Sequence, residues 1–221
     1  MKDRRVVRAI RVLIVDDHRT FAEMLALALG AEADFECVGT AGGSLAAVEL
    51  AGRLRPDMIV MDIQLGPDSG LNAARTIRAT LPDSILVVVS AHDGPEWVVR
   101  AARAGANAFV PKTGSLPQML STLRRARPGS TLVAPSLFGL LPRTAPDAAD
   151  APEKLTAREL EVLGLMGQGM APDAIAHLLN ISVNTCRSYV KTIHARLGVR
   201  SQLEAVVEAH RLGLIEVASG R

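Results

Sequence analysis

Residues 58–70 read MIVMDIQLGPDSG, a short apolar run that stops at Asp62 and is followed at once by a loop containing glycine and proline. An almost wholly apolar run of this length is typical of a strand buried on both faces. A second run of the same kind, ILVVV at residues 85–89, stops at Ser90. Such strands occur in parallel sheets covered by helices, so the two runs indicate the fold of the first half of the chain.

Short β-branched runs alternate with longer helical patterns through about residue 125. The pattern predicts strands at residues 12–15, 36–40, 58–61, 85–89 and 108–110. It predicts helices at residues 21–29, 45–54, 71–80, 96–104 and 116–125. Five strands alternating with five helices predict an α/β domain with a five-stranded, doubly wound parallel sheet over residues 1–126.

The second half of the chain has a different character. Residues 127–152 contain five prolines and many small residues, and we interpret them as a linker. From Leu155 onward the pattern is helical, with helices expected at residues 157–167, 172–179, 183–197 and 202–212. Residues 153–221 are therefore predicted to form a small all-α domain of four helices.

Composition excludes several classes of protein. The chain has 221 residues, of which 48% are hydrophobic and 22% charged, as suits two folded domains. Cys37 and Cys186 lie far apart in the sequence and suggest neither a disulfide framework nor a zinc site. The basic amino terminus precedes too short an apolar run for a signal peptide or a membrane span, so we expect a cytoplasmic protein without membrane contact. A net charge of +2 identifies no nucleic-acid binder by itself.

Polar residues follow four of the five predicted strands. The carboxyl ends of parallel strands meet at one edge of a sheet, where ligands bind. The residues expected there are Asp16, Asp17, Asp62, Ser90 and Lys112. Clustered carboxylates suit Mg²⁺, and Asp62 could then act as a nucleophile toward phosphorus. Lys112 and Ser90 could stabilise the phosphoryl oxygens. Each aspartate alone is more often a turn or cap residue, and only the ordered combination favours the site.

The segments VLIVDDH, IVMDIQL, VVVSAHD and AFVPK resemble the receiver domain of bacterial response regulators over residues 10–126. The resemblance implies that Asp62 accepts a phosphoryl group from a phosphohistidine of a sensor histidine kinase. It implies Mg²⁺ held by Asp17, Asp62 and the backbone carbonyl of Gln64, with Asp16 nearby. It also implies that Ser90 and Phe109 rearrange together and that Lys112 is the family's lysine.

Two positions depart from the receiver pattern. Gly66-Pro67 reverses the usual order of proline and glycine, and Thr113 replaces the proline that often follows the lysine. A regulator that is independent of phosphorylation or controlled by a small molecule therefore stays open as an alternative. A phosphatase with an aspartate nucleophile is a third interpretation, but Gln64 stands where such enzymes need a second carboxylate.

The third predicted helix of the second domain has a polar and basic face. Ser182 is a favourable N-cap, and Cys186, Val190, Ile193 and Leu197 recur at helical spacing on the inward face. The opposite face carries Asn184, Arg187, Ser188, Lys191 and Ala195. Residues 174–203 contain no Asp or Glu, which favours a helix that reads the major groove of DNA. A solvated basic face is the plain alternative.

LTARELEVL and IAHLLNISVNTCRSYVKTIHARLGVRS resemble the LuxR-type helix-turn-helix of NarL/FixJ response regulators over residues 153–215. The resemblance implies a transcription regulator and not an enzyme. Such a regulator would bind two half-sites of double-stranded DNA as a homodimer. Arg187, Ser188 and Lys191 would approach bases or nearby phosphates, Asn184 shares their face, and Thr185 and Arg196 would hold the DNA backbone. Cys186 stands where valine is usual, and Tyr189 where histidine is usual.

Overall fold

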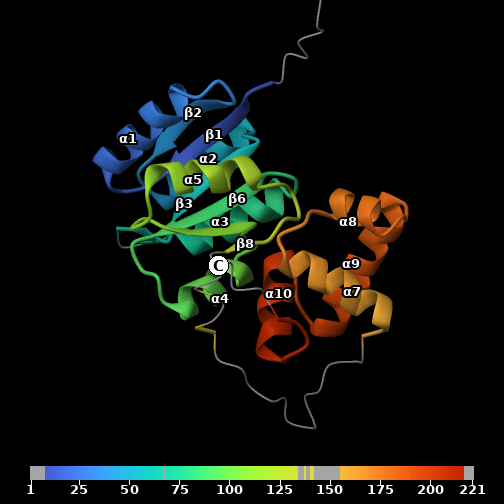
Figure 1. Ribbon diagram of the computed structural model, residues 1–221. Coiled ribbons are helices and arrows are strands. Elements are labelled where there is room, and N and C mark those ends of the chain that lie inside the picture. Colours follow the sequence, from blue (N-terminus) through green and yellow to red (C-terminus); the bar gives the residue numbers. More distant parts are fainter. Residues whose placement is uncertain (1–7, 67, 134–136, 138–139, 142–154, 217–221) are drawn as a thin grey trace, which may run out of the picture. The chain divides into compact units, whose positions relative to one another are not determined.

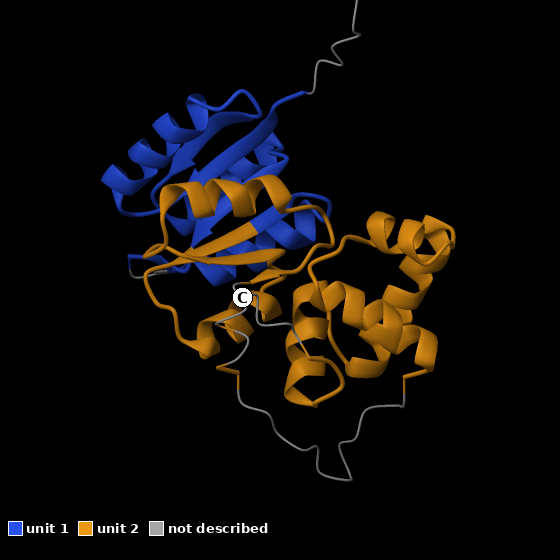
Figure 2. Ribbon diagram, viewed as in Figure 1, with its two compact units in different colours: residues 1–86 blue, residues 87–221 orange. Residues whose placement is uncertain are grey.

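The computed structural model describes residues 8–66, 68–133, 137, 140–141 and 155–216. The chain has two compact units, residues 1–86 and 87–221 (Figure 2). The boundary between the units lies inside strand β6 (Ile85–Ser90), so the strands are described unit by unit.

The first unit contains three parallel strands with β1 (Ile10–Val15) between β2 (Phe35–Ala41) and β3 (Met58–Asp62) (Figure 1). All five residues of β3 are buried, as its apolar sequence predicts. The helices of this unit are α1 (Arg19–Gly30), α2 (Ser44–Leu54) and α3 (Gly70–Thr80). Small residues such as Ala47 and Ala74 are fully buried in α2 and α3, which contact each other.

The loop after β3 forms a small antiparallel ladder that the sequence did not predict. Its strands are β4 (Gln64–Leu65) and β5 (Asp68–Ser69). Pro67, half of the Gly66-Pro67 departure, lies outside the described residues. Gly66 has a φ of 60°, a left-handed conformation that glycine adopts without steric cost.

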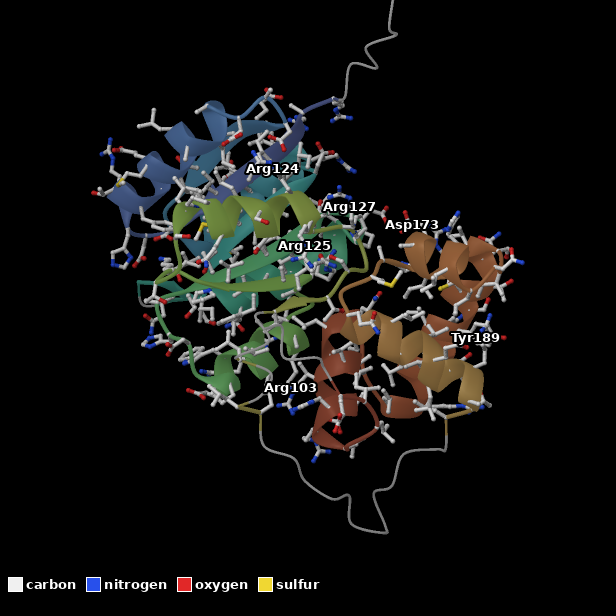
Figure 3. The ribbon with its side chains drawn as sticks, viewed as in Figure 1. Arg103, Arg124, Arg125, Arg127, Asp173 and Tyr189 are labelled. Atoms are coloured by element: carbon white, nitrogen blue, oxygen red, sulfur yellow. The ribbon has the colours of Figure 1, made fainter. Side chains whose placement is uncertain are left out.

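The second unit begins inside β6, at Val87, and continues with α4 (Pro95–Arg103), β7 (Ala108–Pro111) and α5 (Leu116–Arg125). Strand β7 pairs in parallel with β6 on one side and with β8 (Leu132–Val133) on the other. A capping box between Ser115 and Gln118 starts α5. Arg124 and Arg125 lie in its last turn and Arg127 follows it (Figure 3), so positive charge faces the helix C-terminus.

The five strands and five helices expected in residues 1–126 are present, with ends shifted by a few residues. Strand β8 is additional and lies in the stretch interpreted as a linker. Its two residues are too few to give a periodic pattern, and they form a strand because β7 offers them a free edge. The linker residues 134–136, 138–139 and 142–152 lie outside the described residues.

Residues 155–216 form the four expected helices: α7 (Ala157–Gly167), α8 (Pro172–Leu178), α9 (Val183–Leu197) and α10 (Gln202–Arg211). Helix α9 contacts the other three. Its inward residues Cys186 and Ile193 are fully buried, as the helical spacing predicts. Asn180, with a φ of 52°, makes the turn from α8, and the hydroxyl of Ser182 accepts the backbone N–H of Thr185 to start α9.

Candidate functional site

Three aspartates and a histidine meet at the carboxyl ends of β1 and β3. Asp16, Asp17 and His18 follow β1, and Asp62 ends β3. One ligand atom from each of the four residues lies within 4.8 Å of the others. Asp16 and Asp62 are 2% and 4% exposed, whereas Asp17 and His18 are open to solvent. Buried carboxylates held this close repel each other unless a cation or a proton offsets their charge.

Backbone N–H groups orient the three carboxylates. Asp16 accepts the N–H of His18 at 2.9 Å, and Asp62 accepts that of Gln64 at 3.4 Å. Asp17 accepts the N–H of Gly66 at 2.8 Å, a contact between residues 49 apart in the sequence. The loop after β3 therefore holds a carboxylate that belongs to the end of β1.

Gly70 packs against the backbone of Asp62 itself. A Cβ atom at residue 70 would collide with the carbonyl oxygen of Asp62. The N–H of Gly70 donates to the carbonyl of Ile63 at 2.8 Å, which closes the loop onto the start of α3. The absence of a side chain at residue 70 thus sets the position of the strand end that carries Asp62.

The donor set fits a magnesium ion. Carboxylate oxygens are hard ligands of the kind that Mg²⁺ prefers, and three of the four clustered residues supply them. The Nδ1 atom of His18 lies 3.1 Å from a carboxylate oxygen of Asp17. An imidazole is a poor Mg²⁺ ligand, so His18 fits a role beside the carboxylates better than a role on the ion.

The second unit holds the other residues expected at the strand ends. Ser90 ends β6 and is 1% exposed; its hydroxyl accepts the N–H of His92 at 2.9 Å. The N–H of Lys112, just after β7, donates to the carbonyl of Ser90 at 2.7 Å. Phe109 on β7 is 1% exposed. Ser90 and Phe109 therefore lie on two paired strands of one unit, and Lys112 follows the second strand.

A stacked group extends from Ser90 toward α4. The ring of His92 stacks on Trp97 with centroids 5.1 Å apart and an interplanar angle of 13°. The guanidinium of Arg100 lies 4.6 Å from the centroid of the Trp97 ring, a cation–π geometry. His92, Trp97 and Arg100 are outside the set of site residues that the sequence predicts.

The outer face of α9 is exposed where the sequence predicts contact with DNA. Its exposed polar residues are Asn184, Thr185, Arg187, Ser188 and Lys191. Tyr189 also belongs to this helix (Figure 3) and is half-buried. The hydroxyl of Thr185 lies 2.8 Å from that of Ser182, so Thr185 also takes part in the N-cap.

Arg196 has a different environment from the other residues of this set. Its side chain is 26% exposed, and Nη1 donates to Oε2 of Glu159 at 2.9 Å. Glu159 is 4% exposed and lies on α7. His18, Gly66, Gly70 and Glu159 are also outside the set of site residues that the sequence predicts. Two local signals exist: His18 adjoins the aspartate pair, and Thr156 and Glu159 have the spacing of a capping box. The contacts of Gly66 with Asp17 and of Glu159 with Arg196 join residues far apart in the sequence.

Two family models match the chain. The response regulator receiver domain matches residues 12–124, and the luxR family of bacterial regulatory proteins matches residues 153–209. Response regulator protein VraR of Staphylococcus epidermidis is 29% identical over 94% of this chain and 100% of VraR.

Solved structures agree with these matches. A LuxR-family two-component response regulator from Aurantimonas sp. SI85-9A1 is 25% identical over 59% of this chain and 93% of its own, with a TM-score of 0.52. The receiver domain of a response regulator named NarL from Mycobacterium tuberculosis is 30% identical over 53% of this chain and 94% of its own, with a TM-score of 0.50.

Among the helices of the described residues, none combines the length and the apolar character needed to cross a bilayer. The matched models account for both halves of the fold, the parallel-sheet α/β domain and the helical region after it. The chain belongs to the NarL/FixJ-type response regulators and is a DNA-binding transcription regulator of a two-component system, not an enzyme.

Proposed function

We propose that Asp62 is the phosphoacceptor of this regulator and that a sensor histidine kinase is the donor. A carboxylate oxygen of Asp62 forms a bond to phosphorus while the bond from phosphorus to the imidazole nitrogen of a phosphohistidine breaks. The imidazole leaves with the electron pair and takes a proton from solvent. The observation that carries this proposal is the cluster of Asp16, Asp17 and Asp62 within 4.8 Å.

The residues that would hold Mg²⁺ are Asp16, Asp17, Asp62 and the backbone carbonyl of Gln64. A bound divalent cation would offset the charge on the transferring phosphoryl group. We infer from the order of the strand ends that Lys112 supplies a second positive charge and Ser90 a hydrogen bond to the phosphoryl oxygens. Burial of Asp16 and Asp62 supports the pocket, because it limits access of bulk water to an acyl phosphate.

Phosphorylation would switch the chain through Ser90 and Phe109. An aspartyl phosphate adds negative charge and acceptor oxygens, and the Ser90 hydroxyl is placed to change its hydrogen bond in response. The second part of the proposal is that two copies bind two half-sites of duplex DNA. Residues 1–126 would then be the receiver, 127–152 the linker and 153–221 the DNA-binding domain, all acting in the cytoplasm where the promoter lies.

Intact mass after incubation with Mg²⁺ and acetyl phosphate tests the phosphoacceptor. We expect one phosphoryl group on the wild-type chain, none on Asp62→Asn and one on Asp83→Asn. Asp83 is an exposed aspartate of the same unit and is the matched control. An unmodified wild-type chain that still binds a selected DNA duplex would instead support a regulator that does not use phosphate, the alternative suggested by Gly66-Pro67.

A further inference from the structure

Two neighbouring side chains in the first turn of α7 hold both helices of the helix-turn-helix. Thr156 caps α7, and its backbone N–H donates to Oε2 of Glu159 at 2.8 Å in a capping box. The same Oε2 atom accepts Nη1 of Arg196, in the last turn of α9, at 2.9 Å. One buried carboxylate therefore joins the start of α7 to the end of the helix that carries the predicted DNA face.

Arg158 makes the second of these contacts. Its Nη2 donates to the carbonyl of Leu179, at the end of α8, at 3.0 Å. Its Nη1 forms an ion pair with Glu161 at 2.6 Å on the exposed face of α7. Arg158 thus holds the chain just before the turn into α9, and Glu159 holds α9 near its other end. Residues 180–195, which include the turn and most of α9, lie between these two contacts and are called the reading segment below.

The two contacts have different expected strengths. Glu159 is 4% exposed, and a buried charge whose partner is removed is left without compensation. The Arg158 contact is partly exposed and contributes less. A buried ion pair adds little net stability compared with an apolar pair, but it restricts the geometry of the groups around it. Base edges are read by contacts from the helix in the groove, whereas phosphate contacts carry no sequence information, so a change in the angle of α9 should affect recognition of sequence most.

We propose that Glu159 is a positioning residue for DNA recognition and that it acts through Arg196, with Arg158 holding the other end of the reading segment. In this arrangement Arg196 fixes the angle of α9 instead of neutralising a DNA phosphate. The proposal rests on DNA binding by the family and not on phosphorylation of Asp62. Its failure therefore leaves the phosphoacceptor assignment unaffected.

The variant Glu159→Gln separates the ion pair from the helix cap. Glutamine at the same position completes a capping box as glutamate does, so the start of α7 is kept while the charge that holds Arg196 is lost. The matched control is Glu161→Gln, which removes a glutamate from the same helix at an exposed ion pair. The variants Arg196→Gln and Glu159→Gln/Arg196→Gln complete a double-mutant cycle.

The probe is a duplex selected from a random library by the wild-type full chain, compared with a random-sequence duplex of the same length. Fluorescence anisotropy gives both affinities over a range of KCl concentrations, before and after incubation with Mg²⁺ and acetyl phosphate. We expect Glu159→Gln to lower the affinity for the selected duplex about tenfold and the affinity for the random duplex less than about twofold. Glu161→Gln should keep both affinities. The double variant should lose no more affinity for the selected duplex than the weaker-binding of the two single variants.

Two results would overturn the proposal. If Arg196 neutralises a phosphate, Glu159→Gln strengthens binding to both duplexes, and Arg196→Gln lowers the slope of log affinity against log salt by about one. If Glu159 only stabilises the fold, both affinities fall together. Should Glu159→Gln unfold, Arg158→Lys tests the other contact, because lysine keeps the charge but lacks the planar donor group that reaches Leu179. Arg158→Lys should lower the affinity for the selected duplex more than that for the random one, by a smaller factor than expected for Glu159→Gln.

Discussion

The backbone N–H of Gly66 donates to Oδ2 of Asp17 over 2.8 Å, and this bond joins the loop after β3 to the end of β1. Gly66 can present this N–H because its φ is 60°, a conformation that costs other residues about 1–2 kcal/mol. The reversed order of Gly66 and Pro67 therefore coincides with a glycine that orients a magnesium-ligand candidate. With the reversed order, it is a glycine that occupies the position whose N–H binds Asp17.

Gly66→Ala should weaken Mg²⁺ binding by about tenfold, because alanine disfavours the left-handed φ and displaces the N–H from Asp17. Titration with MgCl₂ followed by calorimetry measures the effect. Gly66→Asn is the matched control, since asparagine tolerates this conformation and should keep near wild-type affinity. Equal Mg²⁺ affinity in Gly66→Ala and the wild type would show that the Asp17 contact does not orient a ligand.

Gly70→Ala should destabilise the chain by about 2 kcal/mol and slow its modification by acetyl phosphate, because the added Cβ collides with the carbonyl of Asp62. Urea denaturation and intact mass over time provide the measurements. Gly52→Ala is the control: Gly52 lies inside α2 with open space around a Cβ, and alanine there should stabilise by about 0.5–1 kcal/mol. An unaltered rate in Gly70→Ala would separate Gly70 from the phosphoryl pocket.

Trp97 is the single tryptophan of the chain and stacks on the ring of His92. The backbone N–H of His92 donates to the Ser90 hydroxyl. We expect the intrinsic fluorescence of Trp97 to change when Mg²⁺ and acetyl phosphate are added, because a Ser90 hydroxyl that turns to donate to a phosphoryl oxygen, as proposed above, would alter its bond to His92. Asp62→Asn with the same additions should keep its emission constant. If intact mass shows that the chain is phosphorylated but the emission of Trp97 is unchanged, His92 takes no part in the response to Ser90.

Lys191→Ala should weaken binding to selected and random duplexes by similar factors and lower the salt slope by about one, as loss of one phosphate contact does. Lys191 is exposed on α9, so the substitution should not alter the unfolding temperature. Arg75→Ala, an equal change in charge at an exposed position of α3, is the control and should keep both affinities. Unchanged DNA binding by Lys191→Ala across salt concentrations would contradict the assigned face.

Burial lowers the pKa of His194 on α9 below its ordinary value, because desolvation disfavours the charged ring. Its Nε2 is buried and has no hydrogen-bond partner within the described part of the chain. The unfolded chain therefore binds a proton near pH 6.5 that the folded chain does not bind. The contribution of neutral His194 to the free energy of unfolding is fully present above about pH 6.5 and is lost as the pH falls toward the folded pKa.

Urea denaturation between about pH 7.5 and 5.5 measures this dependence. The free energy of unfolding of the wild type should decrease toward acid more steeply than that of His194→Gln, and the difference between the two isolates His194 from the other histidines. Parallel curves for the two proteins would mean that His194 binds its proton equally in both states.

The local pattern of the chain was sufficient for the main architecture. Apolar runs such as 58–61 that alternate with helical patterns are typical of strands covered by helices on both faces, and parallel strands place their carboxyl ends at one edge. The meeting of Asp16 and Asp17 with Asp62 follows from this rule and is confirmed within the first unit. Helical spacing likewise separated buried Cys186 from exposed Lys191, because a 3.6-residue period divides a helix into two faces.

Tertiary structure alone decided which distant groups meet. Glu159 and Arg196 lie 37 residues apart, and nothing in the sequence around either residue indicates that they share an ion pair. The same holds for the bond between Gly66 and Asp17, and for β8, which becomes a strand only because the edge of β7 is open to it. Periodicity and turn chemistry act over a few residues, whereas these contacts depend on how whole elements pack against each other.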